Sequence, residues 1–402
     1  MQSARGFQFL LSPGPTPVPD RVLNAMHRQS VDFSGPDFIA LSDKIFEDVK
    51  SVFQTKSVVH IYTSNGHGGW EGVLANLLSP GDEILIPEVG VFSEGWRDMA
   101  QALGIVCRTV PNDWRTAIDA NRLEEALRAD VDRKIKAVLF THVDTATGIV
   151  SDVKAARQAI DAAGHPALFC VDAIASLATT DLPMDAWNLD VVVGASQKGL
   201  MMPPGLGLVA ANDRAMEASK TATLPRRYFD WQERIKGMHY QRYAGTAPEH
   251  HIFGLREVLD MLAEEGLQNV FARHRRLADA VRAAVEVWTE GGAFELNALR
   301  PEQRSDSVTS MLAGPNLDVG ALQAMGRPMN LYIGSGAGSM SGKSFRIGHM
   351  GFINEPMILG SLAAIELVLR RAGVAIGQGA MDAAIASLAA AEPARTMANA
   401  AE

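Results

Sequence analysis

The sequence predicts an α/β fold in which a large domain carries a mostly parallel, mixed sheet of the seven-stranded type and a smaller α/β domain follows. From about residue 55 to residue 210, short apolar runs alternate with segments of helical periodicity. The runs contain few polar residues, as expected of strands that helices cover on both faces. Strands that alternate with helices indicate a doubly wound sheet with parallel neighbours.

The individual elements can be placed along the chain. The apolar runs that predict strands are residues 58–62, 83–87, 104–110, 137–143, 167–173 and 189–195. One connecting helix is clear in "SDVKAARQAIDAAG", where Ser151 can cap the first turn and Gly164 can end the last. Residues 254–288 have apolar positions three and four apart, which predicts a long helical stretch.

The C-terminal part carries its own strand and helix patterns. "SVTSMLA" and "SFRIGHM" predict strands, and "MILGSLAAIELVLRRAG" predicts a helix. We therefore expect an N-terminal arm (1–20), a large domain (21–270) and a small domain (271–402).

Bulk composition limits the classes of function. The chain has 402 residues, a formal net charge of −9 and a pI near 5.6, which argues against nucleic acid as the main partner. It has no apolar run of 18 residues, so we expect no membrane insertion. Cys107 and Cys170 lie in apolar runs without metal-type spacing, which favours a reduced, cytoplasmic protein.

Three predicted strands end in polar residues. Thr145 lies in "DTATG" after one strand, Asp172 ends the next, and Lys198 follows the third. Ligands of open α/β sheets bind beyond the carboxyl ends of the strands. Taken singly, Asp172 is explained as a helix cap and Lys198 as a strand-end charge. Together they match pyridoxal phosphate, which needs a Schiff-base lysine and an acid at its pyridine nitrogen.

A glycine-rich helix start offers a place for the phosphate of such a cofactor. In "TSNGHGGWEG", Ser64 or Asn65 can cap the helix, and the glycines at 66, 68 and 69 allow close approach of the backbone. A helix N-terminus attracts anions, although such a start is also explained as an ordinary turn. Phe92 follows another strand, where its ring can stack on the pyridine or belong to the core.

The most specific motifs are "PGPTPVP", "SNGHGGWE", "DTATG", "VDAIASL" and "ASQKGLMMPPGLG". In these motifs, and in the 26-residue interval from Asp172 to Lys198, the chain resembles class V, fold type I aminotransferases of the alanine–glyoxylate and serine–glyoxylate branch. The resemblance extends from "LSPGPTPVPDRVLNAM" to "FRIGHMG", which is most of the chain.

The resemblance implies a role for each matching residue. Lys198 would be the Schiff-base lysine and proton shuttle, Asp172 would pair with the pyridine nitrogen, and Phe92 would stack on the ring. Arg346 would bind the α-carboxylate of the substrate. The remaining implied cofactor contacts are Thr145 near the 3-hydroxyl, Asn65, Gly66, His67 and Gln197 around the phosphate, and Tyr243 and Thr246 at the phosphate of a neighbouring subunit. The last pair implies a homodimer with shared active sites.

The activity implied is transfer of an amino group from serine, alanine or aspartate to a 2-oxo acid such as glyoxylate or pyruvate. Gly245, His250, His251 and the segment "FSGPDF" (33–38) depart from the family pattern and leave the donor open. Pyridoxamine as donor and a pyridoxal phosphate lyase are the alternatives. A desulfurase is disfavoured because both cysteines lie in strand-like runs, and a non-catalytic homologue because Lys198 and Arg346 are both present.

Overall fold

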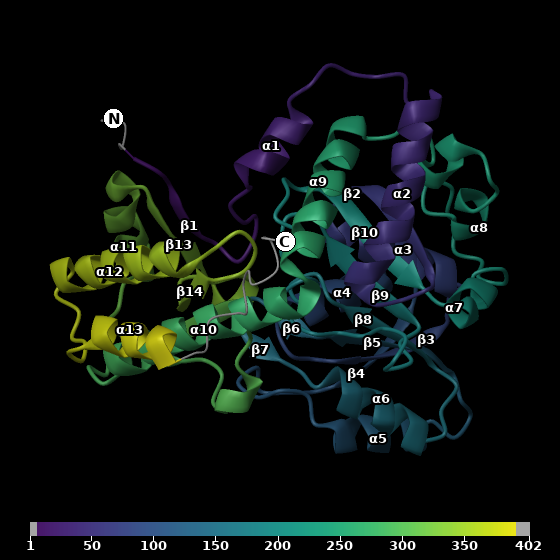
Figure 1. The fold of residues 1–402 in the computed structure, drawn as a ribbon. Coiled ribbons are helices and arrows are strands. Elements are labelled where there is room, and N and C mark those ends of the chain that lie inside the picture. Colours follow the sequence, from purple (N-terminus) through teal and green to yellow (C-terminus); the bar gives the residue numbers. More distant parts are fainter. Residues whose placement is uncertain (1–5, 391–402) are drawn as a thin grey trace.

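The fold is seen in a computed structural model, which describes residues 6–390. Two large sheets with helices packed against them make up most of the molecule, and a third sheet has only two short strands (Figure 1). None of the helices in the described residues is long and apolar enough to cross a membrane.

The large sheet confirms the predicted architecture. Its strands have the order β2-β10-β9-β8-β5-β3-β4, and only β10 runs antiparallel to its neighbours. The bounds are β2 (Val58–Ser64), β3 (Glu83–Pro87), β4 (Val106–Val110), β5 (Ile135–Thr141), β8 (Leu168–Asp172), β9 (Val191–Ala195) and β10 (Gly205–Ala211). Six of these strands coincide with the apolar runs of the sequence. The seventh, β10, follows Pro203-Pro204 and was not separated from the loop in our sequence prediction.

Helices cover both faces of this sheet. They are α1 (Asp20–Met26), α2 (Pro36–Phe53), α3 (Gly66–Leu77), α4 (Val91–Ala102), α5 (Ala120–Ala129), α6 (Val153–Ala162), α7 (Asp213–Ala218), α8 (Trp231–Arg234) and α9 (Glu249–Glu265), with a 3₁₀ turn η1 (His239–Tyr243). Successive strand residues enter opposite cores: Val192 packs with α2 and α9, whereas Val191 and Val193 pack with α3 and α4. Both faces are therefore apolar, which explains why the strands appear as continuous apolar runs.

The start of α6 differs from the prediction. Asp152, not Ser151, is the N-cap, and its carboxylate accepts a hydrogen bond from the Ala155 N–H at 2.8 Å. Ser151 lies one residue before the cap. Its N–H donates to the carbonyl of His142 at 2.8 Å, which ties it to the preceding β6–β7 turn (143–150) and not to the helix. Gly164, with φ of +59°, follows the last helical turn as expected.

The second sheet has the order β1-β13-β14-β12-β11. Its strands are β1 (Phe9–Leu11), β11 (Phe294–Leu296), β12 (Val308–Ala313), β13 (Leu331–Ser335) and β14 (Ser344–Gly348), and its helices are α10 (Leu267–Thr289), α11 (Val319–Gly326), α12 (Glu355–Arg371) and α13 (Ala380–Ala390). The remaining short elements are β6 (Val143–Asp144), β7 (Ile149–Val150), η2 (Pro301–Gln303), η3 (Arg327–Met329) and η4 (Gly338–Met340).

Two features of this second unit differ from the simple division predicted from the sequence. Strand β1 lies within the predicted N-terminal arm, yet it pairs in parallel with β13 and so belongs to the C-terminal sheet. The helical stretch 254–288 is divided into α9 and α10 at Gly266, where φ is +81°. Helix α10 then continues across the predicted boundary at residue 270, with Val270 in the large-domain core and Leu277 in the small-domain core.

Candidate active site

The carboxyl ends of β5, β8 and β9 meet at one edge of the large sheet and border a cavity of about 240 Å³. Asp172 is the last residue of β8, and Lys198 lies three residues beyond the end of β9. The cavity is lined by seven residues predicted from the sequence: Gly66, His67, Phe92, Thr145, Asp172, Gln197 and Lys198. The strand-end rule pointed to Thr145, Asp172 and Lys198, and the structure places these three in one cavity with residues as far away in the sequence as Gly66, 132 positions before Lys198.

Asp172 is a buried acid that forms no ion pair within the described residues. Its Oδ1 accepts a hydrogen bond from the Ile174 N–H at 2.9 Å. Burial raises the pKa of this carboxyl to about 7, and the nearby carboxylate of Asp144 raises it further, while the charge of Lys198 opposes the rise. Such an acid gains stability from a cationic group placed beside it.

Lys198 is held by a loop near the N-terminus. Its Nζ donates a hydrogen bond to the carbonyl of Pro13. A Cβ on Gly14 would lie 2.5 Å from Cδ, Cε and Nζ of the lysine and would displace its end, and the φ of +116° at this residue favours glycine. Burial, followed by the charge of Arg346, lowers the pKa of Lys198 to about 8, although the carboxylates of Asp172 and Asp144 oppose this. About a tenth of the amine is thus neutral, and nucleophilic, at pH 7, far more than for an ordinary lysine.

The same N-terminal loop is fastened to the backbone on both sides of the lysine. The Thr16 N–H donates to the carbonyl of Gln197 at 3.2 Å, and the Thr16 hydroxyl donates to the carbonyl of Lys198 at 3.2 Å. This loop is the "PGPTPVP" motif, which contributed to the family resemblance but had no predicted role in the site. These contacts show that it forms a wall of the site.

The start of α3 is capped as predicted. Asn65 is the N-cap, and its side chain accepts hydrogen bonds from His67 N–H at 3.0 Å and Gly68 N–H at 3.4 Å. The cap therefore engages two of the N–H groups that an anion at this helix start could use. The glycines make room for protein side chains: a Cβ on Gly66 would lie 2.2 Å from Cδ1 of Ile174, and one on Gly69 would lie 2.7 Å from Cγ1 of Val193.

Aromatic rings form one side of the cavity. Phe92 is half-buried, lines the cavity and packs against the core under α3 and α4, whereas its stacking on a pyridine ring stays a prediction. Its ring meets that of Trp70 in a T-shaped arrangement at 6.4 Å. Trp70 also lies 4.6 Å from the ring of His67. Trp70 was not among the predicted site residues, although it stands in the "GHGGWEG" motif.

Arg346 lies on β14 and reaches across from the small domain. Its Nε donates to the carbonyl of Ser335 at 2.6 Å, and its Nη1 donates to the carbonyl of Thr145 at 2.8 Å. Nη2 has no hydrogen-bond partner in the part of the chain that the structure describes. Burial lowers the pKa of Arg346 to about 10, and the charge of Asp144 opposes the shift. The guanidinium is thus fixed by two carbonyls, with one amino group still able to donate.

Tyr243 and Thr246 do not line the cavity of their own chain. The Tyr243 side chain is buried, with its hydroxyl 2.6 Å from that of Ser42 and its ring 5.6 Å from the ring of Phe46. Thr246 is exposed. The single chain thus does not bring this pair to Lys198, and their role at a neighbouring subunit stays a prediction.

His250 and His251, which differ from the family pattern, do not line the cavity. His250 Nε2 is 2.9 Å from the carbonyl of Arg28, and His251 Nε2 is 3.3 Å from the carbonyl of Pro204. Because Pro204 lines the cavity, His251 lies directly behind its wall.

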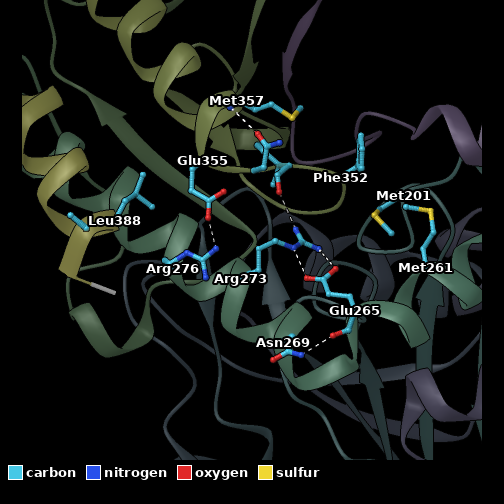
Figure 2. A pocket seen from close by; sticks show the side chains of 13 residues that line it. Met201, Met261, Glu265, Asn269, Arg273, Arg276, Phe352, Glu355, Met357 and Leu388 are labelled. Atoms are coloured by element: carbon cyan, nitrogen blue, oxygen red, sulfur yellow. Dashed lines mark hydrogen bonds and ion pairs between the residues drawn. The ribbon is translucent and has the colours of Figure 1, made fainter. Parts of the chain in front are cut away.

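A larger cavity of about 660 Å³ lies between the helices that join the two domains (Figure 2). Its charged side chains neutralise one another, with Arg276 paired to Glu355 and Arg273 to Glu265. Neither Lys198 nor Asp172 lines it. We therefore assign the chemistry to the smaller cavity at the strand ends.

Comparison with known proteins identifies the family. The class-V aminotransferase model matches residues 8–314. The chain is 41% identical over 390 residues to a serine–glyoxylate aminotransferase of Methylorubrum extorquens, covering 95% of this chain and 96% of the relative. It is 40% identical over 369 residues to an L-aspartate–glyoxylate aminotransferase of Paracoccus denitrificans, covering 91% and 92% of the two chains. The structure matches ureidoglycine–glyoxylate aminotransferase from Bacillus subtilis with a TM-score of 0.87 at 28% identity, covering 96% of this chain and 99% of that one. The chain belongs to the class V aminotransferase family and is an aminotransferase of fold type I.

Proposed function

We propose that this protein is a pyridoxal phosphate-dependent transaminase that moves an amino group from a small amino acid to a 2-oxo acid such as glyoxylate. The observation that carries the proposal is that Lys198 and Asp172 line one cavity at the edge of the large sheet, while Arg346 of the small domain is near enough for its charge to act on Lys198. The two relatives at about 40% identity act, by their names, on glyoxylate.

The residues present fit the cofactor. Asp172 is a buried acid without an ion pair in the described chain, as a protonated pyridine nitrogen requires. Phe92 offers a ring beside the cavity. Pyridoxal phosphate, when bound, supplies an electron sink for the charge that develops at the substrate Cα.

The side chains of this protein then have distinct tasks. Lys198 would attach the cofactor, and its amine, with a pKa of about 8, would accept the proton from the substrate Cα and return it. Arg346 would offer Nη2 to the substrate carboxylate while two carbonyls hold its other nitrogens. Asp172 would keep a positive charge on the ring nitrogen. All three groups are held in place before substrate arrives, so little reorganisation is needed.

Serine, alanine and aspartate are the candidate donors, and glyoxylate and pyruvate are the candidate acceptors. The relatives leave both serine and aspartate open as donors, because the serine enzyme and the aspartate enzyme differ by one percentage point in their identity to this chain. Lys198 and His67 are the basic side chains among the cavity-lining residues, and Arg346 lies next to them. An aspartate donor would want a further cation for its side-chain carboxylate.

We further propose a homodimer in which Tyr243 and Thr246 reach the phosphate of the neighbouring subunit. Thr246 is exposed, and a tyrosine hydroxyl bonded to Ser42 can still form a second hydrogen bond. Co-expression of a Lys198→Ala chain with a Tyr243→Phe, Thr246→Ala chain tests this. Shared sites predict recovered activity in doubly tagged dimers, whereas sites built within one chain predict none.

A donor screen tests the activity itself. The purified protein, supplied with pyridoxal phosphate, is mixed with glyoxylate or pyruvate and with L-serine, L-alanine, L-aspartate or pyridoxamine, and the carbonyl product of the donor is measured. We expect turnover with at least one amino acid and none in Lys198→Ala. Turnover with pyridoxamine alone would identify the alternative donor, and release of ammonia without an acceptor would identify a lyase. Full turnover by Lys198→Ala would contradict the proposal.

A further inference from the structure

Asp144 is a fully buried carboxylate beside the site that does not line the cavity. Its Oδ2 accepts a hydrogen bond from the Phe92 N–H at 2.8 Å. Its Oδ1 accepts from the N–H groups of Ala146 at 2.8 Å and Thr147 at 3.3 Å. A carboxylate surrounded by three donors is a strong acceptor at a defined place.

Each of these bonds positions a part of the site. Phe92 lies in the first turn of α4, so the Oδ2 bond fixes the backbone that carries the cavity-lining ring. The bonds of Oδ1 close the turn that contains Thr145, whose carbonyl accepts from Arg346 Nη1. One carboxylate therefore holds both the backbone of Phe92 and the turn whose Thr145 carbonyl binds Arg346. Arg346 itself belongs to the other domain.

The carboxylate of Asp144 packs directly against the backbone of Gly90. A Cβ on Gly90 would lie 2.3 Å from Cγ of Asp144 and 2.4–2.5 Å from its two oxygens. Contacts this close do not occur in proteins, so a side chain at residue 90 would displace the carboxylate. The neighbouring Ser93 belongs to the same turn but is neutral: its Oγ accepts from Val89 N–H at 3.0 Å and Gly90 N–H at 3.1 Å.

The charge of Asp144 also reaches the reacting groups. Burial raises its pKa, while the three N–H donors and Arg346 favour the charged form. The negative charge of Asp144 supports the protonated form of Lys198, as Asp172 does, and Arg346 acts in the opposite sense. His67 is the other titratable group that interacts with Lys198.

We propose that Asp144 is a positioning residue of the transamination site: its carboxylate holds the ring of Phe92 and the carbonyl that anchors Arg346 at fixed places around Lys198, and its charge offsets that of Arg346 at the lysine. The inference rests on the proposed function for the roles of Lys198 and Arg346. Asp144 does not line the cavity, and it acts through the groups that it holds.

The test compares Asp144→Asn with Ser93→Ala. The asparagine keeps the shape of the side chain but loses the charge, and its Nδ2 faces a backbone N–H that needs an acceptor. The alanine loosens the same turn without changing charge. The first measurement is the pH midpoint for acetylation of Lys198 in the cofactor-free protein, followed by mass spectrometry of its peptide. We expect Asp144→Asn to lower the midpoint by about 0.5 pH unit or more and Ser93→Ala to leave it unchanged.

The second measurement is kcat/KM with the best amino acid and with an amine that lacks a carboxylate. We expect Asp144→Asn to lose at least about tenfold with the amino acid and less with the amine, because Arg346 loses its fixed place. A Lys198 midpoint at the wild-type value together with kcat/KM no lower than that of Ser93→Ala would overturn the proposal.

Gly90→Ala separates charge from position and covers the case in which Asp144→Asn fails to fold, as judged by circular dichroism. It keeps the carboxylate but moves it. We expect its kcat/KM with the amino acid to fall while the Lys198 midpoint stays closer to wild type than in Asp144→Asn. An unchanged kcat/KM would overturn the positioning role. If the wild type transaminates no donor, the proposed function fails, but the lysine midpoint still tests Asp144 independently.

Discussion

Replacement of Lys198 by methionine is expected to stabilise the cofactor-free protein while abolishing its activity. The fall of the lysine pKa from 10.5 to about 8 corresponds to at most about 3 kcal/mol, which is the cost of keeping this amine charged in the folded chain. Methionine has a similar length and carries no charge. The free energy of unfolding of Lys198→Met at pH 7 should therefore exceed that of the wild type by up to about 3 kcal/mol.

The pH dependence of this difference follows from the direction of the shift. Below pH 8 the amine is charged in both the folded and the unfolded protein, so the full cost is present. Between about pH 8 and pH 10.5 the folded protein has lost the proton while the unfolded chain still holds it, so the wild type gains stability as pH rises. The advantage of the methionine variant should shrink across this window and be nearly absent above it.

Urea denaturation of the cofactor-free proteins at a series of pH values measures the effect. Lys154→Met is the matched control, because Lys154 is exposed on α6 and its replacement should not change the pH dependence. The reasoning is refuted if Lys198→Met is no more stable than the wild type at pH 7. It is equally refuted if an advantage persists unchanged between pH 8 and pH 10.5.

Three further substitutions test other parts of the site. Arg346→Gln should lower kcat/KM for amino acids tenfold or more, since a charge-assisted contact of roughly 1.5–3 kcal/mol is lost; an equal loss with a carboxylate-free amine would indicate misfolding instead. Asp172→Asn should weaken pyridoxal phosphate binding in a fluorescence titration, and an unchanged Kd would contradict the assigned role. The pKa of Asp172 is raised from 3.8 to about 7, so between these values the folded protein holds a proton that the unfolded chain has lost. The free energy of unfolding of the cofactor-free wild type should therefore fall as pH rises from 3.8 to 7, and that of the Asn variant should fall less. Gly66→Ala should cost about 1–3 kcal/mol of stability by collision with Ile174, and Ile174→Ala should restore part of it; a Gly66→Ala protein as stable as the wild type would contradict the packing seen here.

The large sheet was predictable because its strands are buried on both faces. Apolar residues at successive positions, as in Val191–Val193, indicate a strand covered on both faces even when the packing partners are unknown. Strand β10 lacks a separate signal because glycine and proline precede it. Asp172 and Lys198 could be found from their positions at strand ends.

Other parts of the site depend on contacts between distant segments. Pro13 and Lys198 are 185 residues apart, and Thr145 and Arg346 are 201 residues apart. No local pattern indicates such a pairing, so the role of Arg346 came only from family resemblance and that of Pro13 was missed. Asp144 was visible in "DTATG", but only its three N–H donors reveal what it does.

Strand β1 has a consequence for the order in which the protein is made. Phe9 pairs with Leu331, so this strand must wait for a partner that the ribosome makes 322 residues later. The loop that holds Lys198 follows β1 directly, and it can be tethered on that side only once this pairing has formed. A nascent chain that has completed the large sheet would thus contain Lys198, Asp172 and Phe92, but it would lack the N-terminal loop in its place beside them. Competence for catalysis should appear only after Leu331 has left the ribosome, and a pulse-labelled translation series would show activity rising later than protease resistance of the large domain.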